Sequence, residues 1–216
     1  MCSLDNSEPG ACPYVLLAVK PQVMKDALEQ IAPFVTDETT VISIAAGVTT
    51  AFMDKILGGR GRIVRVMPNT PMFVGWGVSA LAAGPRATAD DIQWTQKILA
   101  ASGRTVVVEE SMIDAVTAVS GSGPAYFFYL IEAMTAAGVA EGLDPEVAEL
   151  LAVETCIGSG QLLHQTQKPP TLLRKQVTTP GGTTAAALDV MQKSGVQEIL
   201  TEAVRAAAER SRELGK

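Results

Sequence analysis

Short apolar runs alternate with amphipathic stretches over the first half of the chain. Continuous apolar or β-branched runs predict buried strands, since strands in a parallel sheet are covered on both faces. The pattern predicts strands at Tyr14–Val19, Thr40–Ala46, Arg62–Met67, Val78–Ala83 and Thr105–Glu109. It predicts helices from Pro21 to about Phe34, over Thr50–Leu57 and over Ala89–Ala101. This alternation is typical of an open α/β sheet that is covered on both faces.

The pattern changes after Glu110, where strand-like runs stop and helical signals take over. The predicted helices are Pro124–Glu141, a helix capped by Asp144 that runs to about Gln167, Thr171–Val177, a helix ending at Lys193 and a last helix ending at about Leu214. A proline at a helix start and a glycine after its end support the first of these. We therefore expect an α/β domain over residues 1–110 and an all-helical domain over residues 111–216.

The first long helix of the second half is apolar around most of its circumference. The apolar positions include Phe127, Phe128, Leu130, Ile131 and Met134. A helix that is apolar all round is buried, and a helical domain of about 100 residues can hardly bury one alone. We expect this helix to pack against a second subunit; the alternative is a central core helix within one chain.

Composition limits the classes of function. The chain has 216 residues, of which 47% are hydrophobic, and a net charge of −6. The acidic balance argues against nucleic acid as a partner. Small metabolites or other proteins remain as partners. No apolar run approaches the roughly 20 residues that span a bilayer, so we expect no membrane segment.

Cysteine and histidine usage argues against a metal site. The three cysteines have no C-x-x-C spacing and there is one histidine, His164, so a Cys/His zinc site is not expected. Few cysteines fit a reducing, cytoplasmic compartment. The first twelve residues lack the basic and apolar regions of a signal peptide.

One expected element is missing. Dinucleotide-binding α/β domains begin with a strand and a Gly-rich turn that holds the pyrophosphate, and no Gly-x-Gly-x-x-Gly sequence occurs in this chain. Either the chain is N-terminally truncated or the fold never had that unit. Truncation is favoured, because Tyr14–Val19 has the apolar character of an inner strand rather than an edge strand.

The segment Val177–Thr184, with sequence Val-Thr-Thr-Pro-Gly-Gly-Thr-Thr, precedes good helix formers. Its glycines allow close approach of a ligand to the backbone, and a helix N-terminus attracts anions. No Lys or Arg occurs between Arg104 and Lys168. Backbone amides are therefore the expected receptor for a carboxylate; the alternative is a simple helix-opening turn.

Five segments in order resemble the pyrroline-5-carboxylate reductase family. They are Leu17–Gln22, Ser43–Val48, Val66–Pro71, Ser120–Tyr126 and Val177–Thr184. The resemblance implies a partial Rossmann-like open sheet followed by an all-α helical dimerisation domain. It also implies NADPH- or NADH-dependent reduction of 1-pyrroline-5-carboxylate to L-proline, and a homodimer formed through the helical domain, with a higher oligomer left open.

The resemblance implies that the substrate binds at Val177–Thr184, the segment that precedes the predicted helix ending at Lys193. Backbone N–H groups of Gly182, Thr183 and Thr184 would receive the carboxylate, and the Thr184 hydroxyl would hydrogen-bond the ring nitrogen. Glu110 would lie near the ligand; alternatively it is a solvated glutamate at a strand end.

The cofactor is expected at the carboxyl ends of the strands, where open α/β sheets bind ligands. By family position, Ala18, Val19, Lys20 and Pro21 follow one strand, and Ile44, Ala45 and Ala46 follow the next; they would line the ribose and nicotinamide. Asn69 lies at the following strand end, or is a turn residue. Gln176 precedes the substrate segment and would reach the cofactor or the loop backbone.

Two other functions stay open. A dehydrogenase of 3-hydroxy acids also joins an α/β to a helical domain, but its general acid–base lysine is missing, because Pro124–Glu141 contains no Lys. A non-catalytic, oligomerising relative is the other alternative, and the missing Gly-rich turn favours it. Cofactor binding would separate the two.

Overall fold

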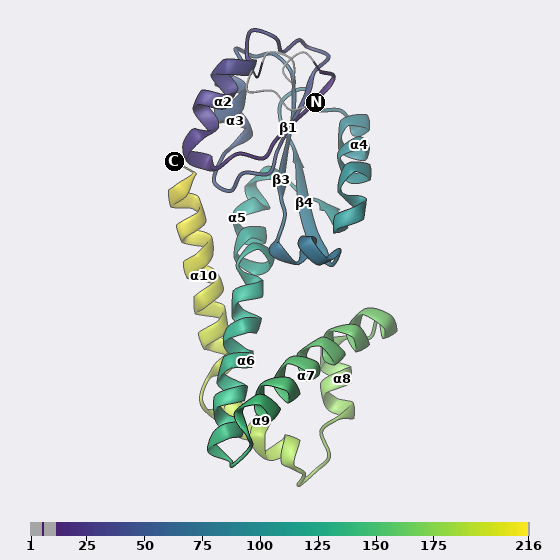
Figure 1. Ribbon diagram of the computed structural model, residues 1–216, viewed down its shortest axis with the longest axis vertical. Helices are drawn as coiled ribbons and strands as arrows, with labels where there is room; N and C mark the ends of the chain where they lie inside the picture. Colours follow the sequence, from purple (N-terminus) through teal and green to yellow (C-terminus); the bar gives the residue numbers. More distant parts are fainter. Residues whose placement is uncertain (1–5, 7–11, 216) are drawn as a thin grey trace. The chain divides into compact units, whose positions relative to one another are not determined.

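The chain divides into two compact units. The computed structural model describes residue 6 and residues 12–215. The first unit comprises Met1–Pro124 together with Val204–Lys216, and the second comprises Ala125–Ala203 (Figure 1). The predicted boundary near Ser111 follows the change in secondary structure. The compact units divide later, because the residues after Ser111 still pack on the sheet: Ile113 is buried with Ala80 and Ala82.

The first unit is built on a five-stranded mixed sheet whose strand order follows the sequence. The strands are β1 (Tyr14–Leu17), β2 (Thr40–Ser43), β3 (Arg62–Met67), β4 (Gly77–Ala83) and β5 (Gly103–Val107). Strands β1, β2 and β3 are parallel, β4 runs antiparallel to β3, and β5 is parallel to β4. All the predicted strands are confirmed, although β1 and β2 end two and three residues before their predicted ends and β5 begins and ends two residues earlier than predicted.

Strand β1 lies at one end of the described sheet. The prediction that it is an inner strand is therefore wrong for the described residues. One face of β1 is also less covered than its apolar sequence suggests: Val15 and Leu17 are buried on one face, whereas Leu16 on the other face is 49% exposed.

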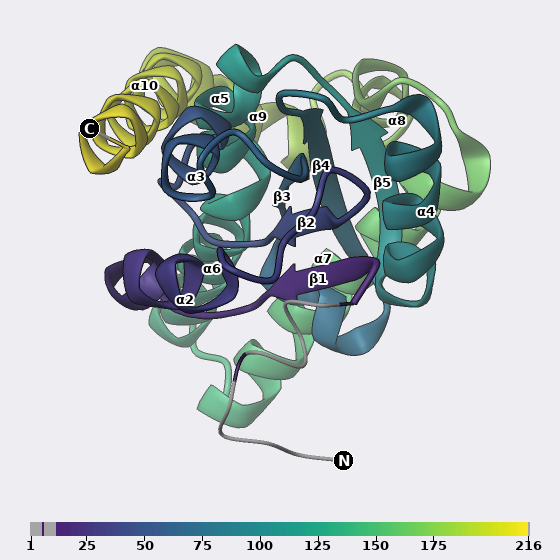
Figure 2. The same ribbon diagram turned by 90° about the horizontal axis from the view of Figure 1, so that it is seen from above.

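Helices cover both faces of the sheet, as predicted. Helices α2 (Met24–Ile31) and α3 (Thr50–Ile56) lie on one face and α4 (Ala89–Leu99) on the other (Figure 2). The larger core cluster, on the α2–α3 face, includes Met24, Leu28, Val41, Met53 and Ile63. The opposite cluster consists of Ile42, Val64, Val66, Leu81 and Leu99.

Short irregular helices complete the first unit. They are 3-10 turns at Pro21–Val23, Thr70–Val74, Ala100–Ser102 and Glu110–Met112, the helix α5 (Ile113–Val116) and a π-helical turn at Thr117–Gly121. The predicted helix from Pro21 to about Phe34 is thus a 3-10 turn followed by α2, which ends at Ile31.

A buried polar network fixes the start of α4. Asp91 is 2% exposed and accepts hydrogen bonds from the Thr88 amide, the Thr88 hydroxyl and the Thr40 hydroxyl. Arg62 adds an ion pair of 3.1 Å. Burial alone raises the pKa of the Asp91 carboxyl, but hydrogen bonds from Thr40 and Thr88 and the charge of Arg62 outweigh it, so this pKa lies below its ordinary 3.8.

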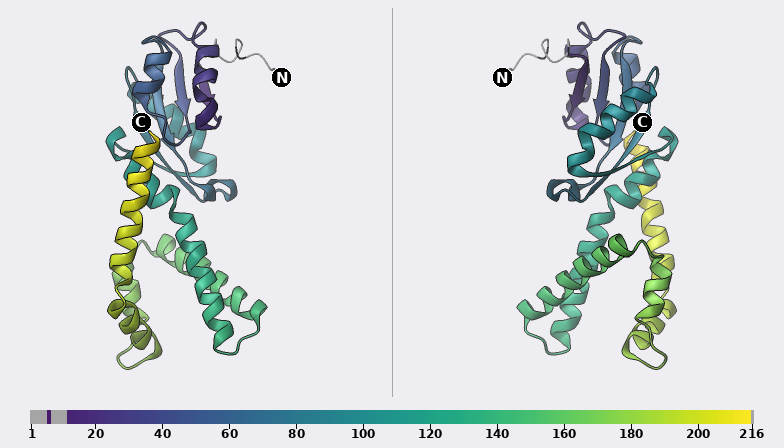
Figure 3. Two further views of the ribbon diagram at one scale, coloured as in Figure 1. Left: turned by 90° about the vertical axis from the view of Figure 1, so that its left-hand side faces the viewer. Right: turned by 90° about the vertical axis from the view of Figure 1, so that its right-hand side faces the viewer.

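The remaining helices are α6 (Gly123–Ala140), α7 (Pro145–Thr166), α8 (Pro170–Gln176), α9 (Thr183–Lys193) and α10 (Val196–Leu214). They build the second unit, except that α10 belongs to the first unit from Val204 onwards. They confirm the predicted helices to within one or two residues, and the Asp144 side chain accepts the Glu146 amide at the start of α7. Figure 3 shows α6 with α7 and α8 with α9 as two separate pairs.

The second unit has almost no core of its own. Between Ala125 and Ala203, all of which the structure describes, only Ala148 and Ala152 are buried. Among the described helices, none has the length and apolar character to cross a membrane.

Candidate active site

The structure brings the predicted cofactor residues of the first unit to one edge of the sheet. Strands β1, β2 and β3 are parallel, so their carboxyl ends lie at the same edge; the register pairs Leu17 with Ser43 and Ser43 with Arg65. The residues that follow these ends are Ala18, Val19, Lys20, Pro21, Ile44, Ala45, Ala46 and Asn69. All are at least partly accessible except Ala45, which is 5% exposed and packs in the core. Ala45 therefore presents its backbone rather than its side chain.

Lys20 and Asn69 differ in their local bonding. The exposed Lys20 ammonium makes no ion pair with any residue that the structure describes. The Asn69 side-chain oxygen accepts the Val78 amide at 2.9 Å. Asn69 thus acts as a turn residue, which was the alternative to a cofactor contact. Its contact with the cofactor stays a prediction.

These strand ends fit one half of a nicotinamide dinucleotide. Ala18 and Ala46 have short, exposed side chains that leave the backbone approachable, and Lys20 is an exposed cation; its contact with a ribose or phosphate oxygen stays a prediction. The pyrophosphate half lacks its usual receptor, because no Gly-x-Gly-x-x-Gly sequence is present in these 216 residues.

Glu110 is bonded within the first unit rather than solvated. Its Oε1 accepts the Thr50 amide at 2.8 Å and Arg65 Nη1 at 3.1 Å, and its Oε2 accepts the Thr50 hydroxyl at 2.5 Å. The strand-end alternative, a solvated glutamate, is therefore wrong, and the predicted contact of Glu110 with substrate stays a prediction. Arg65, which is 5% exposed, was missed; its signal is a second cation of β3, flanked by the apolar residues Ile63, Val64, Val66 and Met67.

The predicted substrate loop joins α8 to α9 in the second unit. Gly181 has a left-handed φ of +73°, and Gly182 precedes the first residue of α9. The Gly182 amide donates to the Thr179 carbonyl at 3.0 Å. It is thus already engaged within the loop. The amides of Thr183 and Thr184 are in the first helical turn, where N–H groups have no intrahelical acceptor, and no side chain caps this end.

A Cβ at Gly182 would clash with Thr179 Oγ1 and lie 3.2 Å from the Thr179 carbonyl oxygen. The φ of −81° at Gly182 is open to every residue, so a larger residue is opposed here by space, and the Thr179 hydroxyl would have to turn away to admit it.

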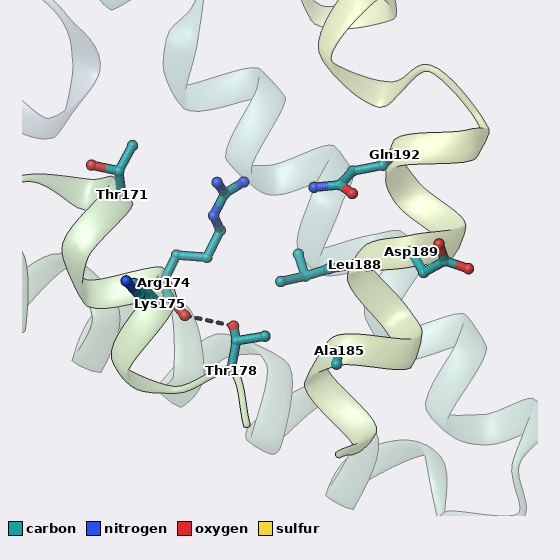
Figure 4. Close-up of a pocket in the computed structure, with 8 residues that line it drawn as sticks. All are labelled: Thr171, Arg174, Lys175, Thr178, Ala185, Leu188, Asp189 and Gln192. Atoms are coloured by element: carbon teal, nitrogen blue, oxygen red, sulfur yellow. Dashed lines mark hydrogen bonds between the residues drawn. The ribbon is translucent and has the colours of Figure 1, made fainter. Parts of the chain in front are cut away.

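A cavity of about 510 Å³ lies between α8 and α9. Its lining residues are Thr171, Arg174, Lys175, Thr178, Ala185, Leu188, Asp189 and Gln192. Figure 4 shows the Arg174 guanidinium extending into the space between the two helices, towards Gln192. Sequence reasoning missed this cation, because it considered only the stretch before Lys168. Gln176 is exposed and does not line the cavity.

No cluster of three or more His, Cys, Asp or Glu side chains that could hold a metal ion occurs among residue 6 and residues 12–215.

Known proteins resemble this chain over almost its whole length. A family described as pyrroline-5-carboxylate reductase dimerisation matches residues 110–214. The chain is 43% identical over 215 residues to the pyrroline-5-carboxylate reductase of Synechocystis sp., covering 99% of this chain and 80% of that protein. The chain belongs to the pyrroline-5-carboxylate reductase family. The Arabidopsis thaliana reductase is also similar, with 41% identity over 202 residues, covering 94% of this chain and 73% of that protein.

Solved pyrroline-5-carboxylate reductases share the fold. The enzyme of Coxiella burnetii matches with a TM-score of 0.94 and 38% identity, covering 99% of this chain and 80% of that chain. The Plasmodium falciparum enzyme, solved with NADP bound, matches with a TM-score of 0.88 and 32% identity, covering 100% of this chain and 82% of that chain. The predicted family and fold class are therefore confirmed.

Proposed function

We propose that this chain reduces the C=N bond of 1-pyrroline-5-carboxylate to give L-proline, with NADPH or NADH as hydride donor. The observation that carries the proposal is the 43% identity to a protein named pyrroline-5-carboxylate reductase over 99% of this chain. The similar Plasmodium falciparum structure with NADP bound supports the cofactor class.

The protein's task in this reaction is mainly to position the reactants. A protonated cyclic imine is already electrophilic, so holding it beside the hydride donor removes much of the barrier. The Thr183 and Thr184 amides would grip the substrate carboxylate, because the start of a helix favours an anion. The Thr184 hydroxyl would hydrogen-bond the ring nitrogen, which fixes the plane of the ring.

The first unit would hold the nicotinamide and its ribose. Lys20 would meet a ribose or phosphate oxygen, while the backbone at Ile44, Ala45 and Ala46 would lie against the ring. When NADPH or NADH is bound, it supplies the hydride that adds to the imine carbon. The ring nitrogen of the product keeps the proton that made the imine electrophilic.

The second unit would assemble as a homodimer. A unit of this size with two buried alanines exposes large apolar side chains, among them Phe127 and Phe128 at 59% each, Leu150 at 60% and Ile157 at 53%. Full burial of one such side chain is worth about 1.5–3 kcal/mol, so a second copy that covers several of them is strongly favoured. The matching family description, reductase dimerisation, supports this assignment.

The proposed substrate class rests on the net charge of the chain, and the proposed cellular compartment rests on its cysteines. The net charge of −6 favours a small-molecule substrate over nucleic acid. Cys156 forms no disulfide, which fits a cytoplasmic location.

The direct test measures imine-dependent loss of NADPH or NADH absorbance by the purified chain. Thr184→Ala should lower kcat by about 10-fold or more, because a positioning hydrogen bond is removed. Thr201→Ala, an exposed helical threonine of the same unit whose hydroxyl bonds only the Gln197 carbonyl, is the matched control and should leave kcat unchanged. A folded dimer that neither turns over imine nor changes NADPH fluorescence would favour the non-catalytic alternative.

A further inference from the structure

The loop between β2 and α3 carries three of the predicted cofactor contacts, Ile44, Ala45 and Ala46. Its two ends are not held by β2 and α3 alone. Two elements that are distant in sequence contact it within the first unit, one at the start of α3 and one at Gly47. These two contacts help to fix the conformation of the loop.

The first contact is the carboxylate of Glu110, at the start of α3. Both of its oxygens accept from Thr50, one from the amide at 2.8 Å and one from the hydroxyl at 2.5 Å. Thr50 is the first residue of α3 and is 3% exposed. A negative charge at a helix N-terminus is stabilised by the helix dipole, so Glu110 anchors the point where the loop becomes helix.

Arg65 fixes that carboxylate in turn. It lies on β3 opposite Ser43, the last residue of β2, and its Nη1 donates to Glu110 Oε1 at 3.1 Å. The Arg65 side chain is 6% exposed and that of Glu110 is 29% exposed. A cation that is so little exposed requires its partner, because an unpaired buried charge is strongly unfavourable. Arg65 and Glu110 therefore hold each other in one geometry.

The second contact is the end of α10, at Gly47. Gly47 has a φ of +75°, and a Cβ there would lie 3.2 Å from the Leu214 carbonyl oxygen. The helix end is itself secured, since the Ser211 hydroxyl bonds Asp114 Oδ1 at 2.6 Å. The middle of the loop thus lies directly against the last turn of α10.

We propose that Glu110, oriented by Arg65, is a positioning residue for the cofactor. By anchoring Thr50 it holds the β2–α3 loop in the shape that presents Ile44–Ala46 at the edge of the sheet. Glu110 then acts through the loop and does not touch the imine. This inference rests on the proposed function, since the loop matters for catalysis only if NADPH or NADH binds there.

The test compares Glu110→Gln with Glu109→Gln in the full chain. Glu109 is the exposed neighbour, so the control changes the same charge without touching Thr50 or Arg65. In the protein without cofactor, amide hydrogen exchange at Thr50 should be about 10-fold faster in Glu110→Gln, as expected when a charge-assisted hydrogen bond is weakened. Glu109→Gln should exchange as the wild type does.

In the same variants, the Kd and KM for NADPH or NADH should rise about 10-fold in Glu110→Gln. The KM for imine at saturating cofactor should stay within about twofold of wild type. Thr50→Val, which removes only the hydroxyl that donates to Oε2, should shift the cofactor KM in the same direction by a smaller factor and keeps the proposal testable if Glu110→Gln does not fold.

Three results would overturn the proposal. They are an unchanged exchange rate at Thr50 in Glu110→Gln, an unchanged cofactor Kd, and a rise in the imine KM alone, which would make Glu110 a direct substrate contact. A wild-type chain that does not reduce the imine would instead contradict the proposed function. The exchange rate of the Thr50 amide would still test whether Glu110 anchors Thr50.

Discussion

Replacing Asp91 by asparagine perturbs the buried network that joins α4 to the sheet. The carboxylate accepts from the Thr40 hydroxyl at 2.5 Å, from the Thr88 amide at 2.8 Å and from the Thr88 hydroxyl at 2.7 Å. Arg62 Nε also donates to it at 3.1 Å. Asparagine is almost the same size, so the change removes charge and acceptors without leaving a cavity.

The magnitude follows from which donors lose an acceptor. An asparagine oxygen can still serve Thr40 and Arg62, but its NH₂ group then faces the Thr88 amide. A buried donor left unsatisfied costs about 1–3 kcal/mol, and bonds to a charged group lose roughly 1 kcal/mol when that group becomes neutral. Arg62 keeps its ion pair with Glu38 at 3.0 Å, and its side chain is 22% exposed. The free-energy loss at Arg62 is therefore small. We expect Asp91→Asn to lower the free energy of unfolding by about 2–4 kcal/mol.

The same carboxyl predicts a pH dependence. Its pKa in the folded chain lies below the 3.8 of an ordinary aspartate. Unfolding would therefore take up a proton below pH 3.8, and the stabilisation is complete above that value and is lost as the pH falls through the folded pKa. The stability difference between wild type and Asp91→Asn should shrink on acidification.

Urea unfolding followed by circular dichroism measures both effects, with Asp90→Asn as control. Asp90 is the exposed neighbour on the same helical turn, so its substitution tests the charge of that turn alone and should change stability by less than about 1 kcal/mol. Equal losses in the two variants, or a difference that grows below pH 3.8, would refute the reasoning.

Two further predictions concern the second unit. Phe128→Asp should convert the dimer to monomer in sedimentation, because a charge replaces an apolar side chain that is 59% exposed in the single chain; an unaltered profile would contradict the proposed interface. Gly182→Ala should raise the imine KM by about 10-fold, because its Cβ would clash with Thr179 Oγ1 and displace the loop. Steady-state kinetics that match wild type would show that the loop does not hold the carboxylate.

Most of the fold could be predicted from local pattern. The strands were recognisable because the apolar runs of β2, β3 and β4 are buried, and the helices because caps such as Asp144 mark their starts. The ends of β1 and β2 were placed too late, since an apolar run does not reveal where pairing stops. Leu17 and Ser43 are the last paired residues, although apolar Ala18 and Ile44 follow them.

The bonding at the site was less accessible from the sequence. Glu110 meets Thr50 and Arg65 across separations of 60 and 45 residues, and no local signal encodes such a contact. The loop before α9 could be predicted in part. Its Gly-Gly sequence correctly marked a helix start, but only the folded turn reveals that the Gly182 amide is already bonded to Thr179.

The order of the compact units along the chain governs how the protein would respond to proteolytic nicking. The first unit is made from the chain's beginning and from Val204–Lys216, and the second unit lies between them in sequence. A single cut after α6, for example near Gly142, yields two fragments that each contribute to the first unit. The nicked protein should therefore migrate as a single species in native gel electrophoresis and separate into two bands only in a denaturing gel.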